Sequence, residues 1–199
     1  GFTAQMQNRL TLRIVFSPEF LTEANSIKDF KASSRVILGG AFEDAQVVYK
    51  YFAGVWPDRL HDVYDRERDL LGHGPVVIAN CDPEVAEMVK LFTNGLLATK
   101  VTFCNEMYKL CESIGVKYEE VRVLALLDSR LGQSHTQVPG PDGHLGAGGS
   151  CFPKDINNLR HMSKQFGTNE KLFTAVIERN EELRPERDWE QLKGRAVTE

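Results

Sequence analysis

The sequence is poor in cysteine, with four cysteines at positions 81, 104, 111 and 151. No two of them form a Cys-x-x-Cys pair and their spacing follows no framework, which argues against a structural zinc site and against a disulfide scaffold. His135 and His144 lack neighbouring ligands, and two isolated histidines are a poor metal signal. We therefore expect reduced thiols and no metal site, and a metal-dependent hydrolase finds no support.

Long apolar runs and an excess of one charge are also missing. No run approaches the ~20 residues of a membrane helix, and the N-terminus lacks the order of a signal peptide. The chain has 24 Lys and Arg against 28 Asp and Glu, a formal net charge of -4. Non-specific attraction to nucleic acid or anionic membranes is therefore not expected. We expect a cytoplasmic protein whose partners are small molecules or proteins, with no nucleic acid and no membrane among them.

The most informative stretch is residues 146–155, Gly-Ala-Gly-Gly-Ser-Cys-Phe-Pro-Lys-Asp. Its three glycines let the backbone approach a ligand closely. Pro153 suits a first helical turn, so we expect a helix to start near it. Cys151 would then lie at the positive end of that helix with Lys154 nearby, and both favour the thiolate of a nucleophile. Asp155 follows by four and would lie beside the sulfur. The simpler alternative is a glycine-rich connection with a small buried cysteine.

This segment resembles the active-site signature of the nucleotide-sugar 6-dehydrogenases, the family of UDP-glucose and GDP-mannose dehydrogenases, which runs Gly-Phe-Gly-Gly-x-Cys-Phe-x-Lys-Asp. Ala147 stands where that pattern has Phe. Residues 17–23, Ser-Pro-Glu-Phe-Leu-Thr-Glu, followed by Arg-Val-Ile-Leu-Gly at 35–39, resemble a second signature of the family. The resemblance covers residues 10–197 and corresponds to the middle of a full-length enzyme.

The resemblance implies a two-step oxidation of the C6 alcohol of a nucleotide sugar, with NAD as hydride acceptor and a thioester on the cysteine. It implies Cys151, Lys90, Asn94, Asp155 and Glu19 as catalytic residues, and Phe20, Leu21, Arg130, Gly148, Gly149, Phe152 and Lys154 as substrate-binding residues. Without the resemblance, Glu19 and the pair Lys90 and Asn94 would count as ordinary solvated groups, and Arg130 as a surface arginine. In the family, the arginine at that position reaches across the dimer to the neighbour's sugar nucleotide.

The rest of the chain predicts a mainly α fold, with a few N-terminal strands left from an α/β domain. We expect strands at 10–16, 35–38 and 76–79, and helices at 43–53, 119–127, 153–166 and 171–183, with a charged helix in 57–71 and a turn-rich loop at 133–145. Residues 80–115 predict one long helix that Gly115 ends; at 1.5 Å per residue it spans about 50 Å, so part of it must pack outside one monomer. Gly95 inside it suggests the close approach of a neighbour or ligand. In the family, such a helix mediates dimerisation.

We expect three parts: residues 1–79, the end of a dinucleotide-binding domain with charged helices; residues 80–184, a helical central and dimerisation domain; and residues 185–199, the start of a truncated C-terminal domain. No Gly-x-Gly-x-x-Gly follows a predicted strand, so the NAD site is expected outside this chain. Two functions stay open: the central part of a UDP-glucose 6-dehydrogenase that forms a homodimer, or an inactive dimerisation or sugar-nucleotide-binding module. UDP-glucose is preferred over GDP-mannose and UDP-N-acetylhexosamines as the nucleotide sugar.

Overall fold

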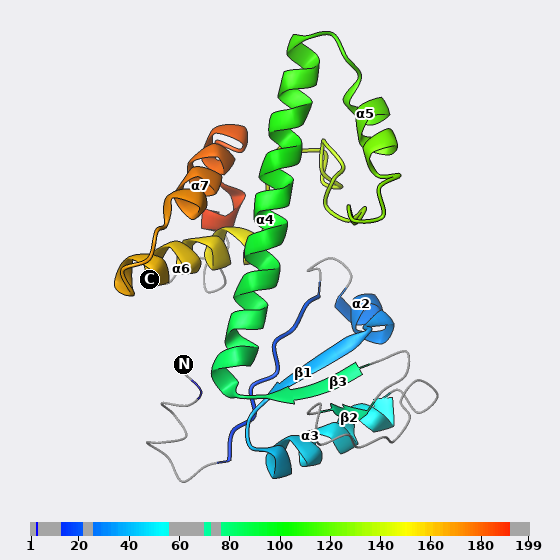
Figure 1. The fold of residues 1–199 in the computed structure, drawn as a ribbon, viewed down its shortest axis with the longest axis vertical. Coiled ribbons are helices and arrows are strands. Elements are labelled where there is room, and N and C mark those ends of the chain that lie inside the picture. Colours follow the sequence, from blue (N-terminus) through cyan, green and yellow to red (C-terminus); the bar gives the residue numbers. More distant parts are fainter. Residues whose placement is uncertain (1–2, 4–12, 22–25, 56–69, 73–76, 192–199) are drawn as a thin grey trace. The chain divides into compact units, whose positions relative to one another are not determined.

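The computed structural model describes residues 3, 13–21, 26–55, 70–72 and 77–191. The described chain is mainly α-helical, as predicted, with one small sheet (Figure 1). It divides into two compact units, residues 1–90 and 91–199. Helix α4 (Pro83–Ser113) begins in the first unit and continues in the second. No helix among these described residues is long and apolar enough to cross a membrane.

The first unit contains a three-stranded sheet in the order β1-β3-β2. Strands β1 (Arg35–Gly39) and β3 (Val77–Cys81) pair in parallel, and β2 (Leu70–Gly72) pairs antiparallel to β3. Helices α2 (Ser26–Ala32) and α3 (Phe42–Val55) complete the unit. Its buried core consists of Val36, Leu38, Ala45 and Ile78, with side chains from α2 and α3 packed against it, Phe30 and Phe52 among them. The predicted strands at 35–38 and 76–79 and the helix at 43–53 are confirmed.

Two predictions for this unit need correction. Of the strand predicted at 10–16, residues 13–16 are described, and they contain only an isolated bridge from Phe16 to Gly39. Among these four residues, Phe16 alone pairs with a strand, through backbone hydrogen bonds to Gly39. Of the charged helix predicted in 57–71, residues 57–69 lie outside the described part of the chain, and Leu70 and Leu71 belong to strand β2. Pairing with β3 therefore decides the conformation at the end of this segment.

The predicted long helix α4 is confirmed. It has 31 residues and ends two residues before Gly115. Gly115 has φ +71°, a backbone conformation that residues other than glycine rarely adopt. The amide of Val116 donates to the carbonyl of Cys111 at 2.9 Å, and that of Gly115 donates to Glu112 at 3.3 Å. These two bonds form a Schellman motif that satisfies the last carbonyls of the helix.

The second unit packs three further helices around its share of α4. Helices α6 (Cys151–Gln165) and α7 (Lys171–Leu183) lie on one side of α4, and α5 (Tyr118–Ala125) lies on the other (Figure 1). A 3-10 helix, η3 (Asp188–Gln191), follows α7. One core joins Ala98 of α4 with Ile156 of α6 and two residues of α7, Val176 and Ile177. A second core, with Cys104, Cys111 and Tyr118, holds α5 to α4.

Gly95 and the start of α6 show how α4 and α6 come together. A Cβ added at Gly95 would lie 2.4 Å from Cδ1 of Leu159, so the predicted close neighbour of Gly95 is helix α6. Helix α6 begins at Cys151, two residues before the predicted start at Pro153. Proline is tolerated throughout a first helical turn, because the amides of that turn have no intrahelical acceptor. Pro153 therefore indicates the first turn but does not mark the first residue.

Candidate active site

Cys151 is the first residue of α6 and is half-buried. The preceding Ser150 makes no side-chain cap, and the first turn of α6 contains no acidic residue. The hydroxyl of Ser150 lies 3.9 Å from Sγ of Cys151. The positive end of the helix dipole is thus not countered by a carboxylate within the first turn, which suits a negatively charged sulfur or ligand there. The predicted thiolate character of Cys151 stays a prediction.

One turn further along α6, Asp155 joins α6 to α4. Asp155 is only 2% exposed, and Asn94 of α4 is 6% exposed. Nδ2 of Asn94 donates to Oδ2 of Asp155 at 2.6 Å, while Nζ of Lys154 pairs with the other carboxylate oxygen. A buried carboxylate is costly unless each oxygen has a partner, and here each has one. The structure therefore brings Asn94, Lys154 and Asp155 together, one helical turn from Cys151.

A second group of predicted site residues lies within the first unit. Nζ of Lys90 pairs with Oε1 of Glu19 at 2.9 Å and also contacts its backbone carbonyl. The other carboxylate oxygen of Glu19 accepts from the amide of Leu21 at 2.8 Å. The ring of Phe20 lies under two cations, with the guanidinium of Arg35 at 4.4 Å and Nζ of Lys90 at 5.6 Å from its centroid. Glu19, Phe20, Leu21 and Lys90 therefore form one contiguous cluster, while their role as site residues stays a prediction.

Arg130 lies in an exposed turn of the second unit, where it pairs with Asp128 rather than with Asp155. Its side chain is 86% exposed and pairs with Asp128 through Nη2 at 2.5 Å and Nε at 3.0 Å. These hydrogen bonds lower the pKa of Asp128 below its ordinary value. Nζ of Lys100 contacts the carbonyl of Gly132 in the same turn. The turn is thus held in place locally, while the guanidinium faces outward.

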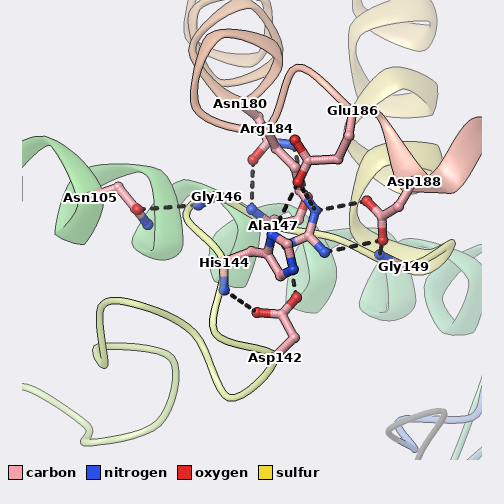
Figure 2. Close-up of polar contacts among 10 residues, drawn as sticks. All are labelled: Asn105, Asp142, His144, Gly146, Ala147, Gly149, Asn180, Arg184, Glu186 and Asp188. Atoms are coloured by element: carbon pink, nitrogen blue, oxygen red, sulfur yellow. Dashed lines mark hydrogen bonds and ion pairs between the residues drawn. The ribbon is translucent and has the colours of Figure 1, made fainter.

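The glycine-rich loop before Cys151 is packed against the end of α7 (Figure 2). Gly146 and Gly149 have φ of +71° and +69°, so both positions favour glycine by conformation. At Gly148 the reason is space, since a Cβ there would lie 2.3 Å from Cζ of Arg184. The close approach predicted from these glycines is therefore made to Arg184. Substrate contacts of Gly148 and Gly149 stay a prediction.

Asn180 and Arg184 hold this loop from α7. Oδ1 of Asn180 accepts from the amide of Ala147 at 2.6 Å, and its Nδ2 donates to the carbonyl of Ala147 at 2.9 Å. Arg184 donates to both oxygens of Asp188, at 2.7 and 3.1 Å. The second oxygen of Asp188 also accepts from the amide of Gly149 at 3.1 Å. The loop is thus bound at Ala147 directly and at Gly149 through Asp188 (Figure 2).

The electrostatics of this network favour a charged Arg184. Burial opposes the charge on Arg184, but the hydrogen bonds to Asp188 and the ion pair with Asp142 outweigh it and raise the pKa of the guanidinium. Burial would likewise raise the pKa values of Asp188 and Asp142. Hydrogen bonds outweigh this effect of burial for both carboxyl groups, so their pKa values fall below the ordinary range. The main donor to Asp188 is Arg184, and the main donor to Asp142 is the backbone amide of His144.

Asn180, Arg184 and Asp188 were not predicted from the sequence as site residues. A signal existed: Asn180 and Arg184 continue the spacing of the buried residues Val176 and Ile177 on α7. Polar residues on the buried face of a helix are uncommon and are normally hydrogen-bonded. A polar residue at such a position is therefore expected to hydrogen-bond to another part of the chain, but the sequence does not reveal which part.

Ala147, the one departure from the family signature, borders a small cavity of about 20 Å³ within the second unit. Its lining includes Thr102 of α4, Phe152 of α6, and Val176 of α7. A cavity of this size has room for about one water molecule. The short side chain at 147 therefore leaves a small hollow behind the glycine-rich loop.

The described residues contain neither a cluster of metal-ligating side chains nor an open glycine turn after β1. Among them, no group of three or more His, Cys, Asp or Glu side chains could hold a metal ion. The glycine pair after β1 is explained by packing, since a Cβ at Gly39 would lie 2.7 Å from Cβ of Ala86, and one at Gly40 would lie 3.1 Å from the carbonyl oxygen of Ile14. A glycine turn that binds a pyrophosphate would instead leave its backbone open to a ligand.

Comparisons with known proteins bear on the family and the fold of this chain. Residues 84–182 match the central domain of the UDP-glucose/GDP-mannose dehydrogenase family. The chain is 34% identical over 178 residues to the UDP-glucose 6-dehydrogenase TuaD of Bacillus subtilis, which covers 89% of the chain and 34% of that protein. It is also 34% identical over 177 residues to the UDP-glucose 6-dehydrogenase of Pseudomonas aeruginosa, covering 89% of the chain and 35% of that enzyme.

Among solved structures, a UDP-glucose dehydrogenase from the archaeon Pyrobaculum islandicum is similar, with a TM-score of 0.65 and 28% identity. The similarity covers 85% of the chain and 34% of that structure. The chain thus spans about a third of the length of the curated relatives it matches.

Proposed function

The chain belongs to the UDP-glucose/GDP-mannose dehydrogenase family, and we propose that it supplies the cysteine-bearing central part of a UDP-glucose 6-dehydrogenase. UDP-glucose is the proposed substrate because the two curated relatives described above are named UDP-glucose 6-dehydrogenases. The proposed overall reaction converts the C6 alcohol of the sugar to the acid in two oxidations. NAD, bound elsewhere in the enzyme, is the proposed acceptor of both hydrides.

In this proposal Cys151 performs covalent capture. Its sulfur bonds to the C6 carbon of the aldehyde formed by the first oxidation, and the carbonyl oxygen takes up a proton to give a thiohemiacetal. Loss of a hydride from C6 and of the hydroxyl proton then leaves a thioester. Water adds to the thioester carbonyl, and the carbon–sulfur bond breaks to release the acid and the free thiol. Capture divides a difficult oxidation into two manageable steps.

The observation that carries this proposal is the buried hydrogen bond between Asn94 and Asp155 at 2.6 Å. It ties the turn that follows Cys151 to the long helix and fixes the orientation of a carboxylate four residues from the sulfur. A carboxylate in that place can orient the attacking water. Lys90, one turn before Asn94 on α4, is the proposed donor to the developing oxyanion, and its partner Glu19 is the proposed proton acceptor.

The proposed enzyme is a homodimer built on α4. Five apolar residues, four in α4 and one directly after it, are each at least 52% exposed: Phe92, Leu96, Phe103, Leu110 and Ile114. At 3.6 residues per turn they fall within about 40° of one another around the helix axis. A narrow apolar stripe of this kind is typical of a helix that packs against another helix. Light scattering is expected to report twice the chain mass, and Phe103→Glu is expected to return the monomer.

The nucleophile assignment is tested by alkylation with iodoacetamide, followed by mass spectrometry of the cysteine peptides. Cys81 is the internal control, because it is about as exposed as Cys151. We expect Cys151 to react about tenfold faster than Cys81 near neutral pH, because a thiolate is the reactive form. Equal rates would favour an inactive binding module.

A second measurement tests turnover. In the enzyme that includes its dinucleotide-binding part, Cys151→Ser is expected to abolish acid formation, while Cys81→Ser leaves it unchanged. Undiminished acid formation by Cys151→Ser would refute the covalent step.

A further inference from the structure

The loop that precedes Cys151 is held by the last turn of α7 and by the segment that follows it. We propose that Asn180 and Arg184 are positioning residues for the nucleophile, acting as a clamp on residues 146–149 that sets where α6 begins. Neither residue is among those that the family signatures indicated. The inference rests on the proposed function, because it takes Cys151 as the nucleophile.

The first half of the clamp is the side-chain amide of Asn180. It makes both possible hydrogen bonds to one residue of the loop, accepting from the amide of Ala147 at 2.6 Å and donating to its carbonyl at 2.9 Å. Asn180 and Ala147 are both buried, with 7% exposure each. A paired amide in a buried place holds the backbone on both sides of Ala147, because one bond is made to the peptide group before this residue and the other to the peptide group after it. Ala147 lies four residues before Cys151.

The second half is the guanidinium of Arg184, which is 5% exposed. It lies among three carboxylates, with Nη1 at 2.8 Å from Asp142 and Nε at 2.7 Å from Asp188 and 3.8 Å from Glu186 (Figure 2). Asp142 belongs to the segment before the glycine-rich loop, and Asp188 accepts from the amide of Gly149 two residues before Cys151. From the C-cap of α7, Arg184 thus holds the segment before the loop directly and the loop itself through Asp188, by charge-assisted contacts.

Gly148 shows how closely the two parts fit. A Cβ at this position would lie 2.3 Å from both Cζ and Nη2 of Arg184. A flexible side chain could usually move aside, but this guanidinium is buried and held on two sides. Only glycine therefore leaves room for the clamp, so the glycine at 148 and the arginine at 184 require each other.

The clamp has a direct consequence for Cys151. Ser150 makes no side-chain cap at the start of α6. The start of the first turn therefore has no side-chain cap, and the contacts to the preceding loop help to set where that turn begins. Releasing the loop is expected to loosen the first turn, and the sulfur would lose its fixed place at the positive end of the helix.

Two measurements on the purified chain test this inference. The first is hydrogen exchange of the loop amides. Asn180→Ala and Arg184→Gln are expected to raise exchange at Ala147 and Gly149 at least tenfold. Asn105→Ala is the matched control, because Asn105 holds the loop only at the amide of Gly146, at 3.1 Å. That variant is expected to spare Ala147 and Gly149. Unchanged exchange in both clamp variants would overturn the clamp.

The second measurement is the pH profile of Cys151 alkylation, with Cys81 as the internal reference. Both clamp variants are expected to slow Cys151 about fivefold near neutral pH and to move the midpoint of its profile upward, with Cys81 unaffected. A purely structural role would lower the melting temperature and leave the Cys151 profile unchanged, and that result would contradict positioning. Equal reactivity of Cys151 and Cys81 in the unmodified chain would instead refute the proposed function and leave the exchange result valid for the clamp.

The close fit between Gly148 and Arg184 allows a double-mutant test of the clamp. This test does not depend on whether one particular variant folds. Gly148→Ala is expected to raise loop exchange strongly when Arg184 is present, and to add nothing when Arg184→Ala has removed the guanidinium. Additive effects of the two changes would refute the fit. Arg184→Lys keeps the charge without the forked geometry, so it is expected to restore only part of the protection if Arg184→Gln does not fold.

Discussion

Helix α4 offers two polar side chains one turn apart, and each holds a carboxylate in a different environment. Asn94 donates a hydrogen bond to Asp155, which is only 2% exposed. Lys90 pairs with Glu19, whose side chain is 55% exposed. The first contact is a neutral amide with a buried acid, and the second is a charged pair open to solvent. The same helix therefore carries one contact that the fold depends on and one that the fold can do without.

The difference follows from solvation. A buried carboxylate that loses a hydrogen-bond donor retains its desolvation cost without compensation. An exposed carboxylate that loses an ammonium partner is simply hydrated. We therefore expect Asn94 and Asp155 to contribute to stability and to the placement of Cys151, whereas Glu19 and Lys90 are available for proton transfer. In each pair, the environment of the carboxylate indicates its role better than the type of residue does.

The largest expected effect is that of Asn94→Leu. This change fills the space of the amide but leaves Oδ2 of Asp155 buried without its donor. The free energy of unfolding is expected to fall by about 2–3 kcal/mol, because a buried charged acceptor loses its partner. Urea unfolding followed by fluorescence of Trp189, in a Trp56→Phe background, would measure this in the second unit.

Lys90→Met is the matched control on the same helix. It removes an ion pair whose acid is largely exposed, so a loss below about 1 kcal/mol is expected. Equal losses for Asn94→Leu and Lys90→Met would remove the distinction between the two contacts.

An intermediate effect is expected for Arg184→Gln, and it depends on pH. The pKa values of Asp142 and Asp188 are lowered in the folded chain, with Arg184 among the causes in each case. A lowered pKa adds stability that is complete above the unfolded value, about 4 for aspartate, and is lost as the pH falls through the folded value. The stability difference between the unmodified chain and Arg184→Gln should therefore be largest near neutral pH and shrink below about pH 4. A difference that stays constant down to pH 2 would contradict this ion-pair origin.

The helices of this chain could be predicted because their patterns are local. The limits of α7 agree residue for residue with the prediction at 171–183, and those of α3 and α4 agree within two or three residues. Apolar periodicity, a proline at the start and a glycine at the end are all contained within a helix itself. The strand at Leu70–Gly72 was missed, because a three-residue strand is defined by its partner β3 rather than by its own composition.

The residues of the candidate site also divide into those with a local sequence pattern and those that depend on contacts between distant segments. Cys151 and Asp155 share one helix, and Lys90 and Asn94 share another, so their spacing was visible in the sequence. The contact of Asn180 with Ala147 joins residues 33 positions apart, and that of Asp188 with Gly149 joins residues 39 apart. Nothing in either segment specifies the other. The signature glycines were recognised, but the partner that requires one of them, Arg184, became visible only in the folded chain.

The smallest effect on stability is expected for Glu19→Gln, and this variant separates the two contacts most sharply. The amide keeps an acceptor for the backbone of Leu21 and for Lys90, so the free energy of unfolding should change by less than about 0.5 kcal/mol. Under the proposed function, the same change removes a proton acceptor, and acid formation by the enzyme with its dinucleotide-binding part should fall about a hundredfold. Stability would be followed by urea unfolding, and turnover by release of the acid product. Full turnover in Glu19→Gln would show that the exposed carboxylate has no chemical role, and proton transfer would then have to be assigned to Asp155, the carboxylate on which the fold depends.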